Sequence, residues 1–435
     1  MIRYILAFAL TVVALPARAI DIQEITSPGG IDAWLVQESS IPFVAIEIVF
    51  DGGATLDLPG KRGATNLMMA LLEEGSGDLD ARGFQEAREA LAASYGFNAY
   101  DDSVSISAVF LTENQDEAVA LLRSALIEPR FDDDAIERVR AQVQSILRSD
   151  AQDPNSIAGA AFDAAAYGDH PYGSSLDGTT ETVAGLRQVD LFDAHRNALV
   201  TGRVHVGAAG DISAEELGAL IDDLIGDLPS DGPDIPDRVE FGLTGGTTII
   251  DYDTPQSVAL FGHAGIERDA DDFFAAFILN EILGGSGLES RLMREVREER
   301  GLTYGIYTYL VPKDLSESYL GQVASSNDTI AEAIDVVRAE WALMANEGVS
   351  AEELAQAKTY LTGAYPLRFD GNADIAGILV GMQAVGLPTE YIENRNDYVN
   401  VVTLEDVNRV ASELLDPDGL HFVVVGQPEG LEASD

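Results

Sequence analysis

Residues 63–76 read GATNLMMALLEEGS, and residues 50–54 shortly before them read FDGGA. In the longer stretch, apolar side chains recur on one helix face: Leu67, Met68, Leu71 and Leu72. This spacing predicts a helix over residues 64–74 that packs on a core. Alternating apolar residues at 43–50 predict a strand before the loop, and Gly75 marks the end of the helix. By itself this is an ordinary amphipathic helix, so its meaning depends on the rest of the chain.

A second distinctive stretch lies at residues 280–304. It begins NEILGGSG at residues 280–287 and continues SRLMREVREERGLTY at residues 290–304. The pattern predicts a glycine-rich turn, a charged helix over residues 289–299 and a strand that starts at Tyr304. The turn is not a phosphate-binding loop, because it follows a helix and lacks the Lys-Ser/Thr ending of such loops.

Together the two stretches resemble the pitrilysin/insulinase peptidases, the group that includes mitochondrial processing peptidase. In that family the first helix carries H-x-x-E-H, in which two His bind zinc and the Glu activates water. The matching positions are Asn66, Met69 and Ala70, and none of these side chains can do that work. The family's third ligand, a Glu on a later helix, would fall near Ser145 or Ile146, where no carboxylate stands. The resemblance covers residues 22–426 and predicts that this chain binds no metal or other cofactor.

The resemblance assigns roles to the second stretch as well. In the family an Arg and a Tyr seven residues apart reach over the zinc site of a facing half, and Arg297 and Tyr304 match that spacing. A guanidinium and a phenol both donate hydrogen bonds, and such donors stabilise the oxyanion that forms when a peptide carbonyl is attacked. The resemblance also implies that the turn lines a peptide chamber: its residues are Gly284, Gly285, Ser286 and Gly287. The family's His-Pro-Tyr-Gly segment recurs at residues 170–173, where we expect His170 to bond locally.

The chain is strongly acidic, with a formal net charge of −48 over 435 residues. This excludes nucleic-acid binding, which needs clusters of Lys and Arg. The acidic residues are scattered over the predicted helix surfaces, so either a solvated surface suited to a salty habitat or an acidic cavity that attracts basic peptides explains them. There is no cysteine, hence no disulfide framework.

The first 19 residues have the features of an export signal. Arg3 supplies positive charge, residues 5–15 form an apolar run, and residues 17–19 read ARA, which fits an A-x-A cleavage site. We predict cleavage after Ala19 and a periplasmic or secreted mature protein. The apolar run is too short to span a membrane, and no other segment is apolar enough.

Two halves follow the signal. Residues 229–240 are rich in Pro, Gly, Ser and Asp and predict a linker between domains at residues 20–228 and 241–435. Residues 189–207 and 407–426 each read as a helix that leads into a strand ending at glycine, which indicates a repeat. We predict an α+β fold of two homologous α/β-sandwich halves, together forming half of a clamshell. One helix is expected over residues 182–198.

The residues and the resemblance together lead to one main hypothesis. The chain is a zinc-free subunit of a heterodimeric metallopeptidase, not catalytic alone, whose homologous partner carries H-x-x-E-H and zinc. Arg297 and Tyr304 would complete the partner's site, and unfolded peptides would be the substrate. The alternatives are a non-catalytic periplasmic protein that binds peptides, and a scaffold that stabilises its partner.

Overall fold

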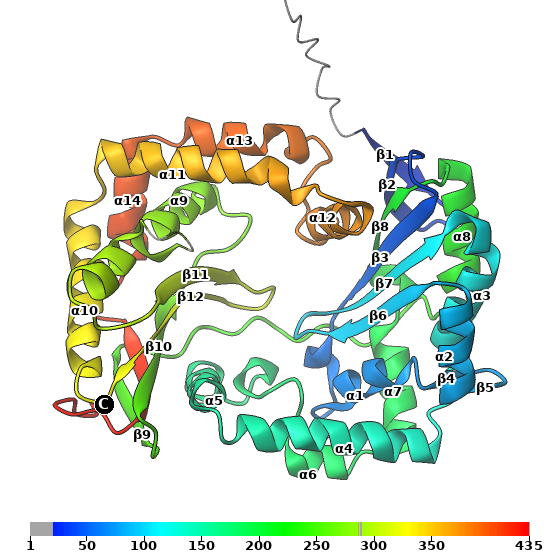
Figure 1. The fold of residues 1–435 in the computed structure, drawn as a ribbon, viewed down its shortest axis with the longest axis horizontal. Coiled ribbons are helices and arrows are strands. Elements are labelled where there is room, and N and C mark those ends of the chain that lie inside the picture. Colours follow the sequence, from blue (N-terminus) through cyan, green and yellow to red (C-terminus); the bar gives the residue numbers. More distant parts are fainter. Residues whose placement is uncertain (1–20, 286, 288, 435) are drawn as a thin grey trace, which may run out of the picture.

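The computed structural model describes residues 21–285, 287 and 289–434. The predicted signal peptide and Ser286 lie outside the described residues. Two β-sheets, each covered by helices, form two halves of the chain around a central space (Figure 1). The fold is α+β, as the sequence predicted.

The N-terminal half holds a six-stranded sheet. In spatial order its strands are β1 (Ile22–Thr26), β2 (Asp32–Gln37), β8 (Val204–Gly210), β3 (Phe43–Asp51), β7 (Ser103–Leu111) and β6 (Ser94–Ala99). A small second sheet pairs β4 (Gly75–Ser76) with β5 (Leu79–Asp80). Only β2 and β8 run parallel in the large sheet, and its other neighbouring strands are antiparallel.

The C-terminal half repeats this sheet without its first strand. In spatial order the strands are β9 (Gly246–Asp251), β13 (His421–Gly426), β10 (Gln256–Ala264), β12 (Glu317–Ser326) and β11 (Ile306–Pro312). Here β9 and β13 form the parallel pair, and the remaining pairs are antiparallel, as in the first half. The same order and directions in both sheets confirm the predicted repeat.

Helices cover the sheets of both halves. The N-terminal half contributes α1 (Ala64–Leu71), α2 (Ala81–Ala90), α3 (Gln115–Ile127), α4 (Asp133–Asp150), α5 (Pro154–Tyr167), α6 (Thr180–Ala184), α7 (Gln188–Ala198) and α8 (Ala214–Ile225). The C-terminal half contributes α9 (Phe273–Gly284), α10 (Ile330–Glu347), α11 (Ala351–Ala364), α12 (Asn372–Ala384), α13 (Tyr391–Val401) and α14 (Leu404–Leu414). Residues 229–245 contain no helix or strand, so the predicted linker has no regular structure.

The single helix expected over residues 182–198 is wrong, because α6 and α7 divide it. The Arg140 guanidinium donates to the carbonyl oxygens of Val183, Ala184 and Leu186. The guanidinium thus satisfies carbonyl groups that have no helical partner where α6 ends, so the break between the two helices is stabilised.

The two halves exchange one helix each. In α5, Ala158 and Phe162 pack on Val423 and Val425 of the C-terminal sheet. Helix α12 crosses the other way and packs on β8 and β2 of the N-terminal sheet, where Leu379 and Met382 join Val36 and Ala209 in one apolar cluster. Each sheet therefore buries one face against a helix of the other half, which holds the halves together.

Two equivalent hairpins meet where the halves join, the β6–β7 turn and the β11–β12 turn (Figure 1). The Lys313 ammonium pairs with Asp101 Oδ2 at 2.7 Å. The Tyr172 hydroxyl donates to Asp102 Oδ1 at 2.5 Å and accepts from the Leu315 amide at 3.1 Å. We call Lys313, Asp101, Asp102 and Tyr172 the clasp, because these side chains link the two hairpins.

A half-buried carboxylate beside the clasp predicts a pH effect on stability. Burial raises the pKa of Asp163 from 3.8 to about 6, although the nearby Lys313 opposes the shift. The folded chain therefore binds this proton more tightly than the unfolded chain, and Asp163 makes folding more favourable as the pH falls through 6 towards 4.

We expect Asp163→Asn to raise the free energy of unfolding at pH 7 by about 1–2 kcal/mol and to weaken its dependence on pH between 7 and 5. Urea unfolding at several pH values measures both effects. Asp169→Asn, at an exposed position, is the matched control. A destabilised D163N protein at pH 7 would contradict the assignment.

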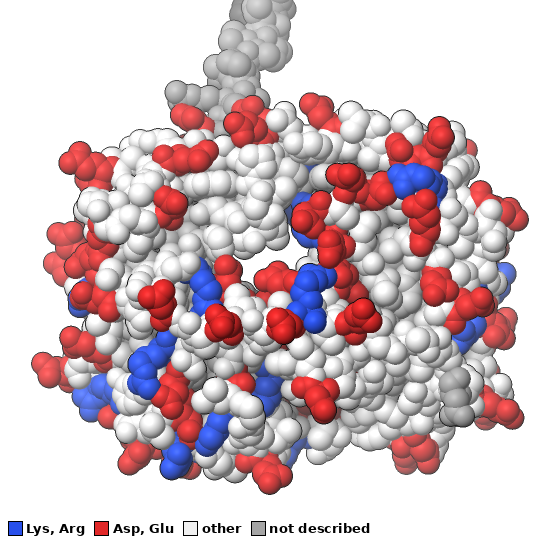
Figure 2. Space-filling model, turned by 180° about the vertical axis from the view of Figure 1, so that it is seen from behind, with Lys and Arg blue, Asp and Glu red and all other residues white. Residues whose placement is uncertain are grey.

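Acidic side chains spread over the face seen in Figure 2, and no single patch collects them. The same view shows a hollow in the middle of the molecule. Among the helices of the described residues, none is both long and apolar enough for a bilayer span.

Candidate functional site

Helix α1 begins at a loop held by the Asp57 carboxylate. This carboxylate accepts hydrogen bonds from the Gly63 amide at 2.8 Å, the Thr65 amide at 2.9 Å and the Thr65 hydroxyl at 2.7 Å. Gly63 has a φ of +95°, and a Cβ there would lie 2.6 Å from the Asp177 carbonyl oxygen, so only glycine fits. The predicted order of strand, loop and helix is confirmed, although α1 ends at Leu71, three residues before the expected end at residue 74.

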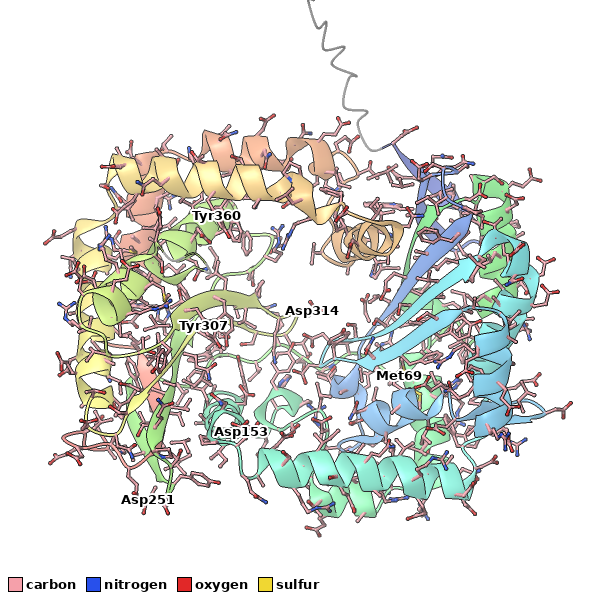
Figure 3. The ribbon with its side chains drawn as sticks, viewed as in Figure 1. Met69, Asp153, Asp251, Tyr307, Asp314 and Tyr360 are labelled. Atoms are coloured by element: carbon pink, nitrogen blue, oxygen red, sulfur yellow. The ribbon has the colours of Figure 1, made fainter. Side chains whose placement is uncertain are left out.

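The three zinc-motif positions on α1 serve the protein's own packing. Met69 is 1 % exposed within the N-terminal core (Figure 3). The Asn66 amide donates to Asp177 Oδ1 at 2.6 Å, and Ala70 presents only a methyl group. Zinc takes imidazole, thiolate or carboxylate ligands, so a thioether, a bonded amide and a methyl group do not fit that metal.

The surroundings of α1 do not replace the missing ligands. Ser145 and Ile146, at the expected third position, both lie on an exposed face of α4. Burial, with a smaller contribution from Asp150, raises the pKa of Asp177. Among residues 21–285, 287 and 289–434, no three His, Cys, Asp or Glu side chains converge as a metal site would require.

The His-Pro-Tyr-Gly segment has a structural role. His170 Nδ1 accepts from the Tyr172 amide at 3.2 Å, and the two rings contact each other edge to face. The expectation of local bonding for His170 is confirmed. Sequence reasoning missed that Tyr172 belongs to the clasp. The family's His-Pro-Tyr-Gly segment marked the position of Tyr172 but not its partners.

The turn that carries Arg297 and Tyr304 rests on two apolar anchors. Val296 is fully buried, Leu302 is 8 % exposed, and the Leu302 amide donates to the Val296 carbonyl at 2.9 Å. Arg297 follows the first anchor inside a π-helical segment, η5 (Met293–Glu298), and its side chain is exposed. Tyr304 follows the second anchor and is 87 % exposed. The backbone is thus fixed while both donors point outward.

The strand predicted to start at Tyr304 begins at Ile306. The Thr303 hydroxyl donates to the Ala324 carbonyl at 2.7 Å and accepts from the Gly305 amide at 3.1 Å. This local turn keeps Tyr304 out of the sheet, which is why its ring stays exposed.

Arg297 differs from the neighbouring arginines. Arg291 pairs with Glu353 at 2.6 Å, and Arg300 pairs with Glu295 at 2.8 Å. Within the part of the chain that the structure describes, Arg297 forms no ion pair, and the Tyr304 hydroxyl forms no hydrogen bond. Both donors are therefore free to serve a group outside this chain.

The glycine turn follows α9 directly. A Cβ on Gly284 would lie 2.5 Å from Thr308 Oγ1, and that hydroxyl donates to Asn280 at 2.8 Å. Gly284 therefore allows α9 to pack closely on β11. A Cβ on Gly285 would meet the Glu281 carboxylate at 2.4 Å. A role of this turn in peptide binding stays a prediction.

Comparisons with known proteins agree with this geometry. A family model described as insulinase (peptidase family M16) matches residues 34–180, and one described as the peptidase M16 inactive domain matches residues 187–361. The chain belongs to the insulinase family, M16. Its repeat of two sheets is therefore an M16 fold.

Three relatives illustrate the M16 match. A non-peptidase homolog from Helicobacter pylori is 23 % identical over 88 % of this chain and 89 % of its own length. An uncharacterized zinc protease from Mycobacterium leprae is 26 % identical over 92 % and 90 %. The structure of a peptidase M16 inactive domain from Pseudomonas fluorescens has a TM-score of 0.88 and 26 % identity, covering 95 % of this chain and 100 % of that one. Two of these descriptions, inactive and non-peptidase, agree with the side chains found at Asn66, Met69 and Ala70.

Proposed function

We propose that this chain is the zinc-free subunit of a heterodimeric M16 metallopeptidase and that it supplies Arg297 and Tyr304 to the zinc site of a partner. The partner is a homologous chain with an intact H-x-x-E-H motif, and the substrate is an unfolded peptide. The export features of the first 19 residues support a periplasmic or secreted location for the complex.

One observation carries the proposal: two strong hydrogen-bond donors stand exposed on an anchored turn, unpaired among the described residues, within a chain whose own motif helix does not fit zinc. Side chains that are exposed and have no polar partner among the described residues are expected to add little to the stability of the chain. Aimed at a developing oxyanion, however, they would stabilise the transition state of peptide cleavage.

The placement of the two halves supports action on another chain. In Figure 3, Met69 on α1 and Tyr307 on β11 lie on opposite sides of the central space. The turn with Arg297 and Tyr304 leads directly into β11. These donors therefore belong to the half that lies across the space from this chain's own motif helix.

We expect Tyr304→Phe to lower kcat of the assembled complex by about tenfold or more and to leave assembly intact, because it removes one oxyanion donor and keeps the ring. Peptide cleavage by the reconstituted complex measures kcat. Tyr307→Phe is the matched control, because Tyr307 is also exposed and its hydroxyl donates to Gln322, a residue of the same sheet. An unchanged kcat for Y304F would refute the role of Tyr304.

The second candidate is capture of peptides without cleavage. The description of the Helicobacter pylori relative as a non-peptidase homolog favours it. Peptide binding by this chain alone, without any copurifying zinc subunit, would support this candidate.

A further inference from the structure

A pocket lies where the exchanged helix α12 meets the helices of its own half. It has a volume of about 360 Å³ and is walled by residues of α9, α12 and the start of α13. Its lining combines aromatic rings, among them Phe273, Phe277 and Tyr391, with aliphatic side chains of α12 such as Ile378 and Met382. A pocket of this size and composition suits a small ligand with an apolar part.

Three arginines also line this apolar pocket. The Arg268 guanidinium lies 4.2 Å from the centroid of the Phe273 ring and donates to the Tyr391 hydroxyl at 3.3 Å. Arg395 is 6 % exposed, and its guanidinium carbon lies 4.8 Å from the centroid of the Tyr365 ring. The third, Arg368, is an exposed residue of the pocket lining.

No carboxylate neutralises this group within residues 21–285, 287 and 289–434. Arg268, Arg368 and Arg395 form no ion pair there, whereas most other described arginines do. Burial and, more weakly, repulsion from Arg368 act to lower the pKa of Arg395. Like charges that lie close together without a counter-ion are unfavourable. In a chain with a net charge of −48, such a group is a specific local feature.

We infer that this pocket binds the C-terminal carboxylate of a peptide that ends in a hydrophobic residue. The carboxylate would pair with Arg368 and Arg268 at the polar end, since guanidinium groups bind carboxylates through paired hydrogen bonds. The terminal apolar side chain would pack between the aromatic rings and the aliphatic side chains of α12. A bare inorganic anion would leave that apolar wall unused.

The inference takes its ligand class, a peptide, from the proposed function, while the pocket itself is separate from Arg297 and Tyr304. Binding to the purified chain alone tests it without any partner or catalysis. A failed peptidase assay and a failed binding assay are therefore distinct results.

The test is isothermal titration of the chain with an N-acetylated pentapeptide that ends in leucine, as the free acid and as the C-terminal amide. The acid is expected to bind at least tenfold more tightly than the amide. A matched acid that ends in serine is expected to bind more weakly than the leucine acid, because it leaves the apolar wall uncovered.

Two variants assign the effect to the pocket. Arg368→Gln is expected to remove most of the difference between acid and amide, and to keep the fold because the side chain is exposed. Arg148→Gln, at an exposed arginine on α4, is expected to bind as the unaltered chain does. Equal binding of acid and amide, no binding of either peptide, or an unchanged R368Q protein would each overturn the inference.

Discussion

Replacement of Arg297 by alanine is expected to lower kcat of the assembled peptidase by about 100-fold and to change KM little. Loss of one preorganised oxyanion donor typically has an effect of this size. The side chain makes no ion pair within the described residues, so its removal is expected to leave the free energy of unfolding nearly unchanged. A large loss of kcat without a loss of stability is the signature of a residue used only in the transition state.

Arg294→Ala is the control for this variant. Arg294 lies on the same π-helical segment, is exposed, and pairs with the adjacent Glu295 at 3.2 Å. We expect R294A to keep at least half of the activity. If R297A retained full kcat, or if both variants lost activity equally, the turn would have a structural role only.

Replacement of Lys313 by methionine is expected to reduce the free energy of unfolding by about 2–4 kcal/mol. Lys313 pairs with Asp101, and its ammonium lies 4.4 Å from the centroid of the Tyr172 ring. Burial acts to lower the pKa of Lys313, but nearby carboxylates, chiefly Asp101, raise it above its usual value. Methionine would remove one of the two cations paired with Asp101, leaving Arg62 at 3.1 Å, and would leave the half-buried Asp163 without the nearby Lys313 charge. Loss of the cation beside partly buried carboxylates is destabilising.

The double variant K313M/D101N separates the pair from the packing. It removes both charges of the pair, so we expect it to recover part of the loss in urea unfolding, the recovery being limited because Arg62 then loses its partner Asp101. A cost below about 0.5 kcal/mol for K313M alone would show that the clasp contributes little to the junction of the halves.

The repeat could be predicted from sequence because it depends on local patterns. Residues 189–207 include most of α7 and the first part of β8, and residues 407–426 include most of α14 and all of β13. These elements occupy equivalent places in the two halves. Periodicity reports which face of an element is apolar, and both copies carry the same pattern. The strands have the same order in both sheets because helices and strands follow one another in the same order along both halves of the chain.

The exchange of helices could not be predicted in this way. The apolar side chains of α5, such as Phe162, indicate a buried face but do not say which sheet covers it. The clasp has the same difficulty, because Lys313 and Asp101 are far apart in the chain and meet only through two folded hairpins. Long-range contacts of this kind carry no local signal.

In the candidate site, too, local features could be predicted from the sequence and long-range ones could not. The spacing of Arg297 and Tyr304 and the changed residues at Asn66, Met69 and Ala70 were readable from the sequence. The exposure of Tyr304 could not be read from the sequence, because it depends on the turn at Thr303, after which β11 begins only at Ile306. The arginine pocket was missed altogether, since Arg268, Arg368 and Arg395 lie on separate segments and only the packing of the helices brings them together.

The most direct test of the split-peptidase account is a tagged purification of this chain from its native host, followed by metal analysis and cleavage of a quenched peptide with and without chelator. If this chain is half of a split peptidase, it should copurify with a stoichiometric second chain that carries H-x-x-E-H. The purified heterodimer should hold about one zinc ion, and the chelator should abolish cleavage. A lone chain without zinc or activity would contradict it, and so would zinc and peptidase activity in this chain by itself.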